Sequence, residues 1–405
     1  EKANRVVTIE ESIEKAKAIA KRHEEKENLE IIVGNIQDIV LEEKFDYIMM
    51  NGMLEQAPLS IKSETPFITF LEIVASYLKE DGKLLIATDN KFGISYWNGK
   101  KDLDGTYEYR NLGTKRRKNQ AQLFSEKNLD NMLKQAKMNH NKFYYIFPDY
   151  KMPNLIYSKE YDISKEDISR NFTCYEEDEL VGFVENDVLR ELIKEDSKLI
   201  NFYANSFLIE CSRKEIDTNI KYVSYTNYRK KEYRIMTIIK EDVVEKRAVS
   251  KESLNHIEQM KQNREILKQY NIKTLEQSKD DYLESEFVKN FKRYDLWIDE
   301  CDDIEEAIEA IKPYIEKLYE NGIAYDKVKK EELCHSLQEC DQNQLKQFQY
   351  LEYGFMDFIP KNIFYKNNEL YAFDQEWMEK YIPVEHILYR AIINSNLYRK
   401  FSDDI

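Results

Sequence analysis

Residues 353–377 read YGFMDFIPKNIFYKNNELYAFDQEW, and this stretch decides the fold of the C-terminal part of the chain. Asp357 and Asn362 are five positions apart, and Asp374 follows twelve positions later. Alternating apolar residues interrupted by an Asn-Asn turn predict a short β-hairpin over 363–373. Such a hairpin would bring Asp374 back beside Asn362, so we expect the three polar side chains to lie close together.

These residue types suit phosphoryl transfer. That reaction needs a carboxylate to orient the acceptor hydroxyl and accept its proton, and oxygen ligands that hold Mg²⁺ against the phosphates. The segment resembles the catalytic core of the aminoglycoside-phosphotransferase-like and carbohydrate kinases, which often carry Asp-x-Glu where this chain has Asp374-Gln375-Glu376. The resemblance implies that Asp357 is the catalytic base, that Asn362 and Asp374 are Mg²⁺ ligands, and that ATP is the phosphoryl donor. Taken singly, each residue is also explained by a local turn or a strand end.

Upstream of this segment the pattern predicts a small sheet followed by helices. We expect strands over 222–228, 233–239, 243–249 and 282–288, a helix over 252–270 after the third strand, and a second long helix over 303–320. A small sheet lobe followed by a mainly helical lobe is the order of a kinase fold.

Lys246, in the third of these strands, is the candidate phosphate-binding lysine, and a plain surface lysine is the alternative. Glu258 and Glu265 are seven apart on the predicted helix, so they share one face and either could pair with Lys246. By the same resemblance, Glu286 and Val288 would lie at the hinge that meets the adenine.

Strands and helices alternate through the first 150 residues. We expect strands over 5–9, 29–33, 45–50, 83–88 and 142–147, with helices over 12–23, 67–78 and 129–136. This alternation predicts a parallel sheet with helices on its faces.

Several polar residues follow these strands. Glu10 ends the first strand, where Rossmann-type domains carry an acid that binds ribose hydroxyls. Gly34–Asp38, which includes Asn35, resembles the adenine-contacting segment of class I S-adenosylmethionine-dependent methyltransferases, and Phe45–Glu55, which includes Asn51, resembles the motif facing the methyl donor. The resemblance implies that Glu10, Asn35, Asp38 and Asn51 bind S-adenosylmethionine. The alternative for each acid is an ordinary strand end.

Glycine is scarce, at 10 of 405 residues. No Gly-rich cofactor loop is visible and the chain does not begin with Met, so we expect the first methyltransferase strand and its Gly-rich turn to be missing. We therefore expect this chain to bind S-adenosylmethionine poorly and the intact protein to bind it. Residues 221–235 also lack glycine, which leaves a non-catalytic pseudokinase or recognition module as an alternative for the C-terminal half.

We predict three parts of an α/β chain. Residues 1–158 form a Rossmann-like, doubly wound methyltransferase sheet that is incomplete at its N-terminus, 159–218 form a connector, and 219–405 form a bilobal α+β kinase-like domain. The combination resembles the bifunctional methyltransferase–kinases that cap bacterial O-antigen chains. This resemblance implies a glycan, sugar-nucleotide or lipid-linked acceptor from surface-polysaccharide synthesis, and glycosyltransferases of the same pathway as candidate partners. A third hypothesis is a methyltransferase whose C-terminal half only recognises substrate.

Composition limits the remaining choices. A net charge of −15 argues against a nucleic-acid binder, and no apolar run approaches the roughly 20 residues of a membrane span. Five scattered cysteines indicate a reducing compartment, and the Cys334-His335/Cys340 group matches no zinc pattern. We expect a cytoplasmic protein, at most peripheral at the inner face of the membrane. The basic run 115–118 is interpreted as a solvated loop, with an anion or membrane contact as the alternative.

Overall fold

The computed structural model describes residues 3–113, 120–165, 184–288, 291–333, 335–367, 369–395, 397 and 400. The basic run 115–118, Cys174 and Cys334 lie outside these residues. The chain divides into two compact units, Glu1–Ser224 and Tyr225–Ile405, and each is described by itself.

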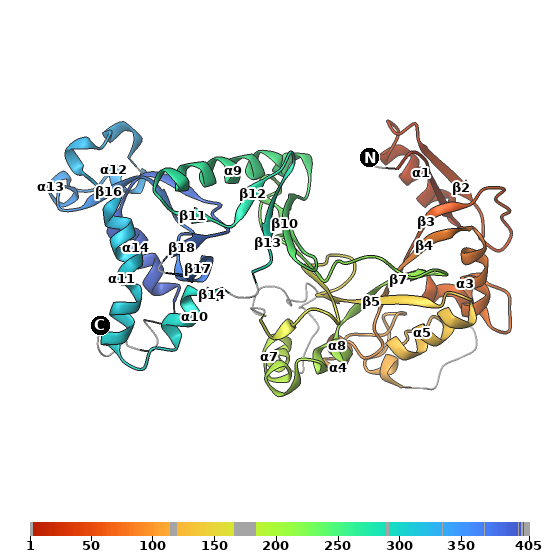
Figure 1. The fold of residues 1–405 in the computed structure, drawn as a ribbon. Helices are drawn as coiled ribbons and strands as arrows, with labels where there is room; N and C mark the ends of the chain where they lie inside the picture. The colour runs from red at the N-terminus through yellow and green to blue at the C-terminus, as the bar shows by residue number, and fades with distance from the viewer. Residues whose placement is uncertain are drawn as a thin grey trace. The chain divides into compact units, whose positions relative to one another are not determined.

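The first unit is built on one mixed sheet in the order β8-β6-β5-β7-β4-β3 (Figure 1). Its strands are β3 (Phe45–Asn51), β4 (Leu78–Asp89), β5 (His140–Phe147), β6 (Leu155–Ser158), β7 (Ser206–Ser212) and β8 (Tyr222–Tyr225). β3 and β4 run parallel, as the alternation of strands and helices predicts, whereas the pairs from β4 through β7, β5 and β6 to β8 are antiparallel.

Strand β7 is an inner strand of this sheet. Ile209 lies opposite Ile86 of β4 on one side and Phe143 of β5 on the other, and all three side chains are buried. The connector that we predicted over 159–218 therefore contains a central strand of the first unit, and the division of the chain falls later, after Ser224. The apolar run of β7 needs neighbours on both edges, but a local pattern does not say which strands supply them.

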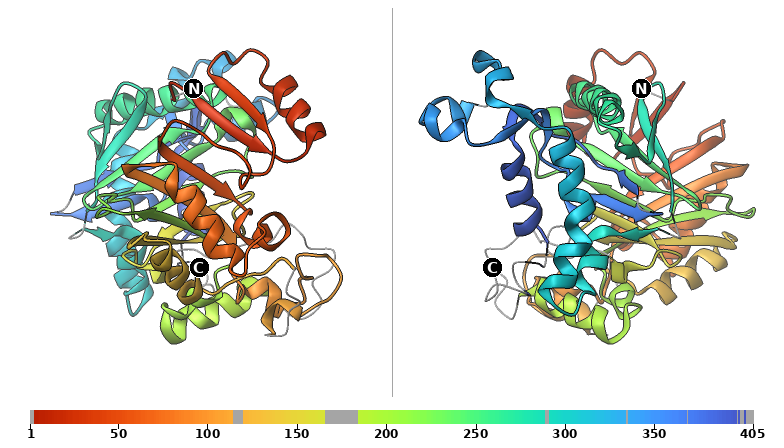
Figure 2. Two further views of the ribbon diagram at one scale, coloured as in Figure 1. Left: turned by 90° about the vertical axis from the view of Figure 1, so that its right-hand side faces the viewer. Right: turned by 60° about the vertical axis from the view of Figure 1, so that its left-hand side comes forward.

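A second, smaller layer of the first unit contains β1 (Val6–Glu10), α1 (Ile13–Arg22) and β2 (Leu29–Val33). β1 and β2 are parallel in register from Val6↔Leu29 to Glu10↔Val33, and α1 packs on both strands (Figure 2, left). Ser12 caps α1 by accepting the N–H of Lys15 at 3.3 Å. Within the described residues, β1 and β2 form a sheet of their own and β3 is the edge of the larger sheet.

Two helices cover one face of the larger sheet. α3 (Pro66–Ser76) contacts β4, α5 (Glu126–Gln135) contacts β5, and the two helices contact each other (Figure 1). Pro66 suits the first turn of α3, where no N–H is needed, and the Ser125 hydroxyl caps α5. The described part of the first unit also contains α2 (Ala57–Ser60), α4 (Ile94–Trp97), α7 (Glu185–Asp196) and α8 (Leu199–Tyr203).

The second unit begins with a small antiparallel sheet in the order β12-β13-β10-β9. Its elements are β9 (Ile235–Ile239), β10 (Val243–Ala248), α9 (Leu254–Gln269), β12 (Glu276–Ser278) and β13 (Tyr282–Glu286). α9 lies against β10 and β13 (Figure 1), and Ile235, Ile257, Met260 and Leu283 form the core between helix and sheet.

The described part of the second unit also contains helices and two further sheets, in the orders β11-β18-β17-β14 and β15-β16-β19; β11 pairs with β18 in parallel, and the other pairs are antiparallel. The elements are β11 (Lys273–Thr274), β14 (Lys292–Arg293), α10 (Tyr294–Asp299), α11 (Ile304–Glu320), β15 (Ile323–Ala324), α12 (His335–Gln338), α13 (Gln342–Leu345), β16 (Gln349–Phe355), β17 (Ile363–Lys366), β18 (Glu369–Ala372), β19 (Met378–Pro383) and α14 (Val384–Ile393). The predicted hairpin is β17–β18, with Ile363 opposite Ala372. Tyr314, Phe358 and Ile387 belong to the core that holds α11, the hairpin and α14 together.

The mixed α/β class is therefore confirmed, and the long helices and strands lie within a few residues of their predicted positions. In the described part of the chain, no helix has both the length and the apolarity of a membrane span.

Leu84, at the centre of β4, is fully buried, so we expect Leu84→Ala to destabilise the first unit by about 2–5 kcal/mol through lost burial and a cavity. Urea unfolding followed by hydrogen exchange of β4 peptides measures this free energy. The control Leu59→Ala removes the same atoms from a side chain that is 61% exposed, and it should change stability by less than about 0.5 kcal/mol. Equal effects of the two substitutions would contradict the burial of β4.

Candidate functional site

Lys246 is the centre of a charged cluster inside the second unit. It lies on β10, opposite Thr237 and Leu283, and only 8% of its surface is exposed. Its ammonium group forms an ion pair with Asp374 and lies 3.7 Å from Glu276 Oε1. Burial alone would lower the pKa of Lys246, but the carboxylates of Asp374 and Glu276 outweigh burial and raise it. Lys246 is therefore a buried permanent cation rather than the surface lysine of the alternative interpretation.

Asp374 follows the β17–β18 hairpin in a left-handed conformation, with φ of +58°. This backbone region is uncommon outside glycine and is tolerated best by Asn and Asp. The N–H of Asp374 donates to Glu276 Oε1 at 2.9 Å, so Glu276 holds both the backbone of Asp374 and the side chain that Asp374 binds. Burial raises the pKa of Asp374, and the Lys246 cation opposes this shift.

Glu376, two residues later, is 5% exposed and is held from two directions. Arg229 pairs with both of its oxygens, and His256 Nε2 of α9 lies 2.9 Å from Oε2. Asn263 of α9 donates to the carbonyls of Gln375 and Glu376, each at 3.1 Å. Burial works to raise the pKa of Glu376, but the His256 contact and the cations of Lys246 and Arg229 lower it to about 2. Glu376 therefore stays ionised.

Asp357 lies beneath this segment. Its Oδ2 accepts the N–H groups of Glu376 at 3.3 Å and Trp377 at 3.2 Å. Burial, reinforced by the negative charges of Asp374 and Glu376, raises the pKa of Asp357 to about 6. A carboxylate with this pKa is ionised at neutral pH, yet it accepts a proton more readily than an exposed aspartate, which suits a general base.

Asn362 lies immediately before β17 and donates its amide N–H to the carbonyl oxygen of Asp357 at 3.1 Å. That bond uses the amide nitrogen, so the side-chain oxygen is the atom that suits a hard cation. The structure thus gathers Lys246, Asp357, Asn362 and Asp374 in one part of the second unit, as the sequence predicted. No group of three or more His, Cys, Asp or Glu side chains with metal-binding geometry occurs within the described residues.

The prediction that Glu258 or Glu265 pairs with Lys246 is wrong. Glu258 pairs with Lys261 and Glu265 pairs with Lys268, both on the exposed side of α9. Glu276 of β12 takes the position beside Lys246 instead. The two glutamates do share one helical face, but α9 turns its apolar face and its His256 and Asn263 side chains inward.

The predicted hinge residues lie at the end of β13. Glu286 is exposed and its backbone pairs with Val243, while Val288 is half-buried two residues later. Adenine binding there stays a prediction.

The residues predicted to bind S-adenosylmethionine lie at the carboxyl ends of three strands in the first unit. Glu10 ends β1 and accepts the N–H of Ser12 at 3.1 Å. Asn35 follows β2 and donates to Glu11 at 2.9 Å and to the Ser60 carbonyl at 2.8 Å. Asp38 closes the same turn by donating its N–H to the Asn35 carbonyl at 2.9 Å, and its side chain is exposed.

Asn51 is the exposed last residue of β3. The next residue, Gly52, has φ of +62°, and a Cβ there would lie 2.3 Å from the Tyr150 hydroxyl. The chain therefore needs glycine at this turn, which brings Tyr150 close to the carboxyl end of β3.

Sequence reasoning missed a buried polar cluster behind this edge. Thr88 donates to Glu55 Oε1 at 2.6 Å, and Asp89 accepts from Tyr96 at 3.0 Å and Ser206 at 2.8 Å. Burial raises the pKa of Glu55 despite the Thr88 hydrogen bond, and within the described residues its Oε2 has no hydrogen-bond partner. Glu55 is the last residue of the predicted motif over 45–55. The sequence therefore identified the residue, but the local pattern did not show that it is buried.

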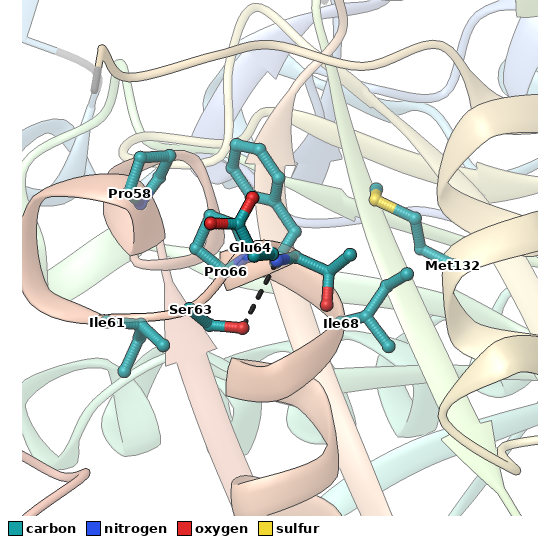
Figure 3. A pocket seen from close by; sticks show the side chains of 9 residues that line it. Pro58, Ile61, Ser63, Glu64, Pro66, Ile68 and Met132 are labelled. Carbon is teal, nitrogen blue, oxygen red and sulfur yellow. Dashed lines mark hydrogen bonds between the residues drawn. The ribbon is translucent and has the colours of Figure 1, made fainter. Parts of the chain in front are cut away.

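A pocket of about 330 Å³ lies elsewhere in the first unit, beside the start of α3 (Figure 3). Pro58, Ile61, Pro66, Ile68 and Met132 supply much of its apolar lining, and Thr65 donates its N–H to Ser63 Oγ at 3.1 Å at its rim. It contains none of the predicted site residues.

Residues 8–160 match the family model described as a methyltransferase domain. This confirms the predicted methyltransferase-like nature of the N-terminal part. The match ends before β7 and β8, which also belong to the sheet of the first unit. No curated protein sequence matches the chain.

Several solved structures of methyltransferases resemble part of the chain. The N-methyltransferase NodS from Bradyrhizobium japonicum with S-adenosyl-L-homocysteine is 16% identical, with a TM-score of 0.20, over 22% of this chain and 42% of its own. A SAM-dependent methyltransferase from Thermotoga maritima is 15% identical, with a TM-score of 0.29, over 51% and 72%. An O-methyltransferase family 2 protein from Planctomyces limnophilus complexed with apigenin is 12% identical, with a TM-score of 0.27, over 52% and 43%.

The chain spans less than half the length of NodS, at 42% and 47% of two NodS structures. All of these TM-scores are below 0.5, so the assignment of a methyltransferase domain rests on the family match.

Asp357 makes stability depend on pH. Its pKa of about 6 exceeds the value of roughly 4 in an unfolded chain, so its stabilising contribution is fully present below pH 4 and is lost as pH rises through 6. Asp357→Asn keeps an oxygen for the N–H groups of Glu376 and Trp377. We expect the variant to equal wild type near pH 4 and to exceed it by about 2 kcal/mol at pH 8, with partial solvent exposure limiting the gain.

Chemical unfolding at both pH values, with a chelator present, measures the difference. The control is Asp326→Asn, because Asp326 is exposed and should give the same difference from wild type at both pH values. A variant of Asp357 that is less stable than wild type at pH 8 would show that the carboxylate is not held in an unfavourable environment.

Proposed function

We propose that this protein combines an S-adenosylmethionine-dependent methyltransferase with an ATP-dependent phosphotransferase of the kinase-like class. The family match over residues 8–160 carries the first activity. The convergence of Lys246, Asp357 and Asp374 in the second unit carries the second.

For the methyltransferase, Glu10, Asn35, Asp38 and Asn51 are the residues that would hold the cofactor. Carboxylates and amides at the carboxyl ends of strands suit ribose hydroxyls and an adenine amine: Glu10 ends β1 of the parallel pair β1–β2, Asn35 and Asp38 follow β2, and Asn51 ends β3 of the larger sheet. Asp38 and Asn51 are exposed. When bound, S-adenosylmethionine supplies an electrophilic methyl group. Asn35 holds the loop after β2 against Glu11 and Ser60, and this would keep the adenine-binding turn in place.

For the phosphotransferase, Asp374 and Asn362 offer the carboxylate and amide oxygens that Mg²⁺ prefers, so the residues fit the ion. Mg²⁺ supplies charge neutralisation for the nucleotide phosphates. Lys246 would bind phosphate oxygens, and Glu276 would keep the ammonium group in position. Asp357 would orient the acceptor hydroxyl and accept its proton, a role for which a pKa of about 6 is suited.

The acceptor that we propose is a sugar of a bacterial surface polysaccharide or its sugar-nucleotide or lipid-linked precursor. Trp377 supports this choice. Its backbone N–H donates to Asp357, and 37% of its surface is exposed, so the residue bonded to the proposed base carries a partly exposed aromatic ring. Aromatic faces beside polar groups suit sugar rings. With an acceptor of this kind, the expected protein partners are glycosyltransferases of the same pathway.

A second function is favoured by one observation. Lys246 and Asp374 pair with each other, and the loop before β9 has no glycine, as in a pseudokinase that recognises substrate without catalysis. In that case the methyltransferase would be the only activity.

Mg²⁺-ATP should raise the melting temperature of the second unit by about 5–10 °C at a hundredfold excess over Kd, because a ligand of the native state stabilises it by mass action. Asp374→Ala removes a metal ligand and should abolish this shift, whereas Asp326→Ala should keep it. Thermal-shift titration with and without chelator decides the matter. A folded wild-type protein that does not respond would leave the pseudokinase alternative.

Glu10→Gln and Asp38→Asn should each weaken S-adenosylhomocysteine binding by the full-length protein about tenfold, since each removes one or two charge-assisted hydrogen bonds. Calorimetric titration gives the affinities. Glu25→Gln, at an exposed position after α1, is the matched control and should bind as wild type does. Unchanged affinity in both site variants would move the cofactor site away from these strand ends.

A further inference from the structure

The loop between β8 and β9, residues 226–234, contains no glycine and is rich in cations. It is nevertheless folded: the Arg229 N–H donates to the Thr226 carbonyl at 3.1 Å, and Arg234 Nε donates to the Arg229 carbonyl at 2.8 Å. A glycine-rich loop would offer backbone N–H groups to phosphates. This loop offers side-chain cations instead, and its structure aims one of them inward.

Arg229 is that inward cation. Its side chain is 21% exposed, and its two terminal nitrogens contact the two oxygens of Glu376. The guanidinium also lies 5.9 Å from the ring centre of Trp377 and 5.8 Å from that of Tyr228. By contrast, the neighbouring Lys230 is exposed. Arg229 is therefore held in the cluster by a fork of hydrogen bonds and by aromatic rings.

Two cations thus bind two carboxylates of one short segment. Lys246 from β10 pairs with Asp374, and Arg229 from the loop pairs with Glu376. A nucleotide triphosphate with Mg²⁺ carries both kinds of partner: the metal for a carboxylate and phosphate oxygens for cations. When a nucleotide binds, the cations could exchange their carboxylate partners for phosphate oxygens, and a carboxylate could exchange its cation for the metal. Each of these groups would still face a partner of opposite charge.

We propose that Arg229 binds the phosphates of the nucleotide and takes the place of a glycine-rich loop. This inference rests on the proposed phosphotransferase function. A guanidinium forms two parallel hydrogen bonds with phosphate as well as with carboxylate. Glu376 would not be left without contacts when Arg229 turns to the nucleotide, because His256 and the segment held by Asn263 remain in place.

The test is calorimetric binding of Mg²⁺-ATP, magnesium tripolyphosphate and adenosine to wild type, Arg229→Gln and Arg229→Lys. Loss of two charge-assisted hydrogen bonds should weaken ATP and tripolyphosphate by about 10- to 100-fold in Arg229→Gln, with adenosine unchanged. Arg229→Lys keeps the charge without the fork and should lose less. It also carries the test if the glutamine variant does not fold.

Arg247→Gln is the matched control. Arg247 is the next residue to Lys246 on β10, but it pairs with Glu245 and lies 3.7 Å from the ring centre of Tyr282, away from the cluster. This variant should bind all three probes within about twofold of wild type.

The outcomes separate this inference from the function on which it rests. If wild type binds neither Mg²⁺-ATP nor tripolyphosphate, the phosphotransferase proposal fails. If wild type binds both and Arg229→Gln binds them equally well, only the role of Arg229 is overturned. If Arg229→Gln weakens adenosine as much as ATP, Arg229 supports the fold of the site and does not bind phosphate.

Discussion

The second unit depends on the electrostatics of three consecutive residues, Asp374-Gln375-Glu376. A carboxylate taken out of water needs a cation or several hydrogen-bond donors, or its ionised form becomes very costly. Three elements answer this requirement: β10 supplies Lys246, α9 supplies His256 and Asn263, and the loop before β9 supplies Arg229. A fourth element, β12, supplies Glu276, which accepts the N–H of Asp374. The small sheet, its helix and the β17–β18 hairpin are thereby fixed around one segment. Removing Lys246 would take away the ion-pair partner of Asp374, whereas Glu376 is held from two directions, so the network specifies the arrangement as well as stabilising it.

The same network prepares the site for chemistry. It holds one carboxyl group, Asp357, at a pKa of about 6 and another, Glu376, at about 2, although the two are joined by a hydrogen bond through the N–H of Glu376. Groups so close in space and so different in pKa are suited to different roles, one as a base and one as a permanent charge. The difference comes from the partners: the Glu376 carboxylate is bound by Arg229 and His256, whereas the Asp357 carboxylate accepts the backbone N–H groups of Glu376 and Trp377.

In the first unit the organising constraint is hydrophobic. β4 and β7 are apolar on both faces, and each must lie between two other strands. Their central position leaves the carboxyl end of β4 buried, where Thr88 and Asp89 form a polar cluster with Glu55. The carboxyl ends of β1, β2 and β3 remain accessible, and the polar residues that the methyltransferase proposal uses lie there.

Much of this could be predicted from the sequence alone. Periodicity located the helices α1, α3, α5, α9 and α11 and most strands, because local side-chain patterns reflect the face that an element buries. The spacing of Asp357, Asn362 and Asp374 predicted their approach, since a short hairpin leaves the chain few other paths. These are properties of neighbouring residues.

The tertiary structure decided the rest. The place of β7 within the first sheet and the burial of Glu55 against Thr88 join residues far apart in the chain. The pairings of Lys246 with Glu276 and of Arg229 with Glu376 do the same. A helix pattern shows that Glu258 and Glu265 share a face, but only packing shows that this face is exposed. The sequence therefore determined the helices and strands and the chemical groups that they carry. Long-range burial decided which charged groups were removed from water and therefore required a partner of opposite charge.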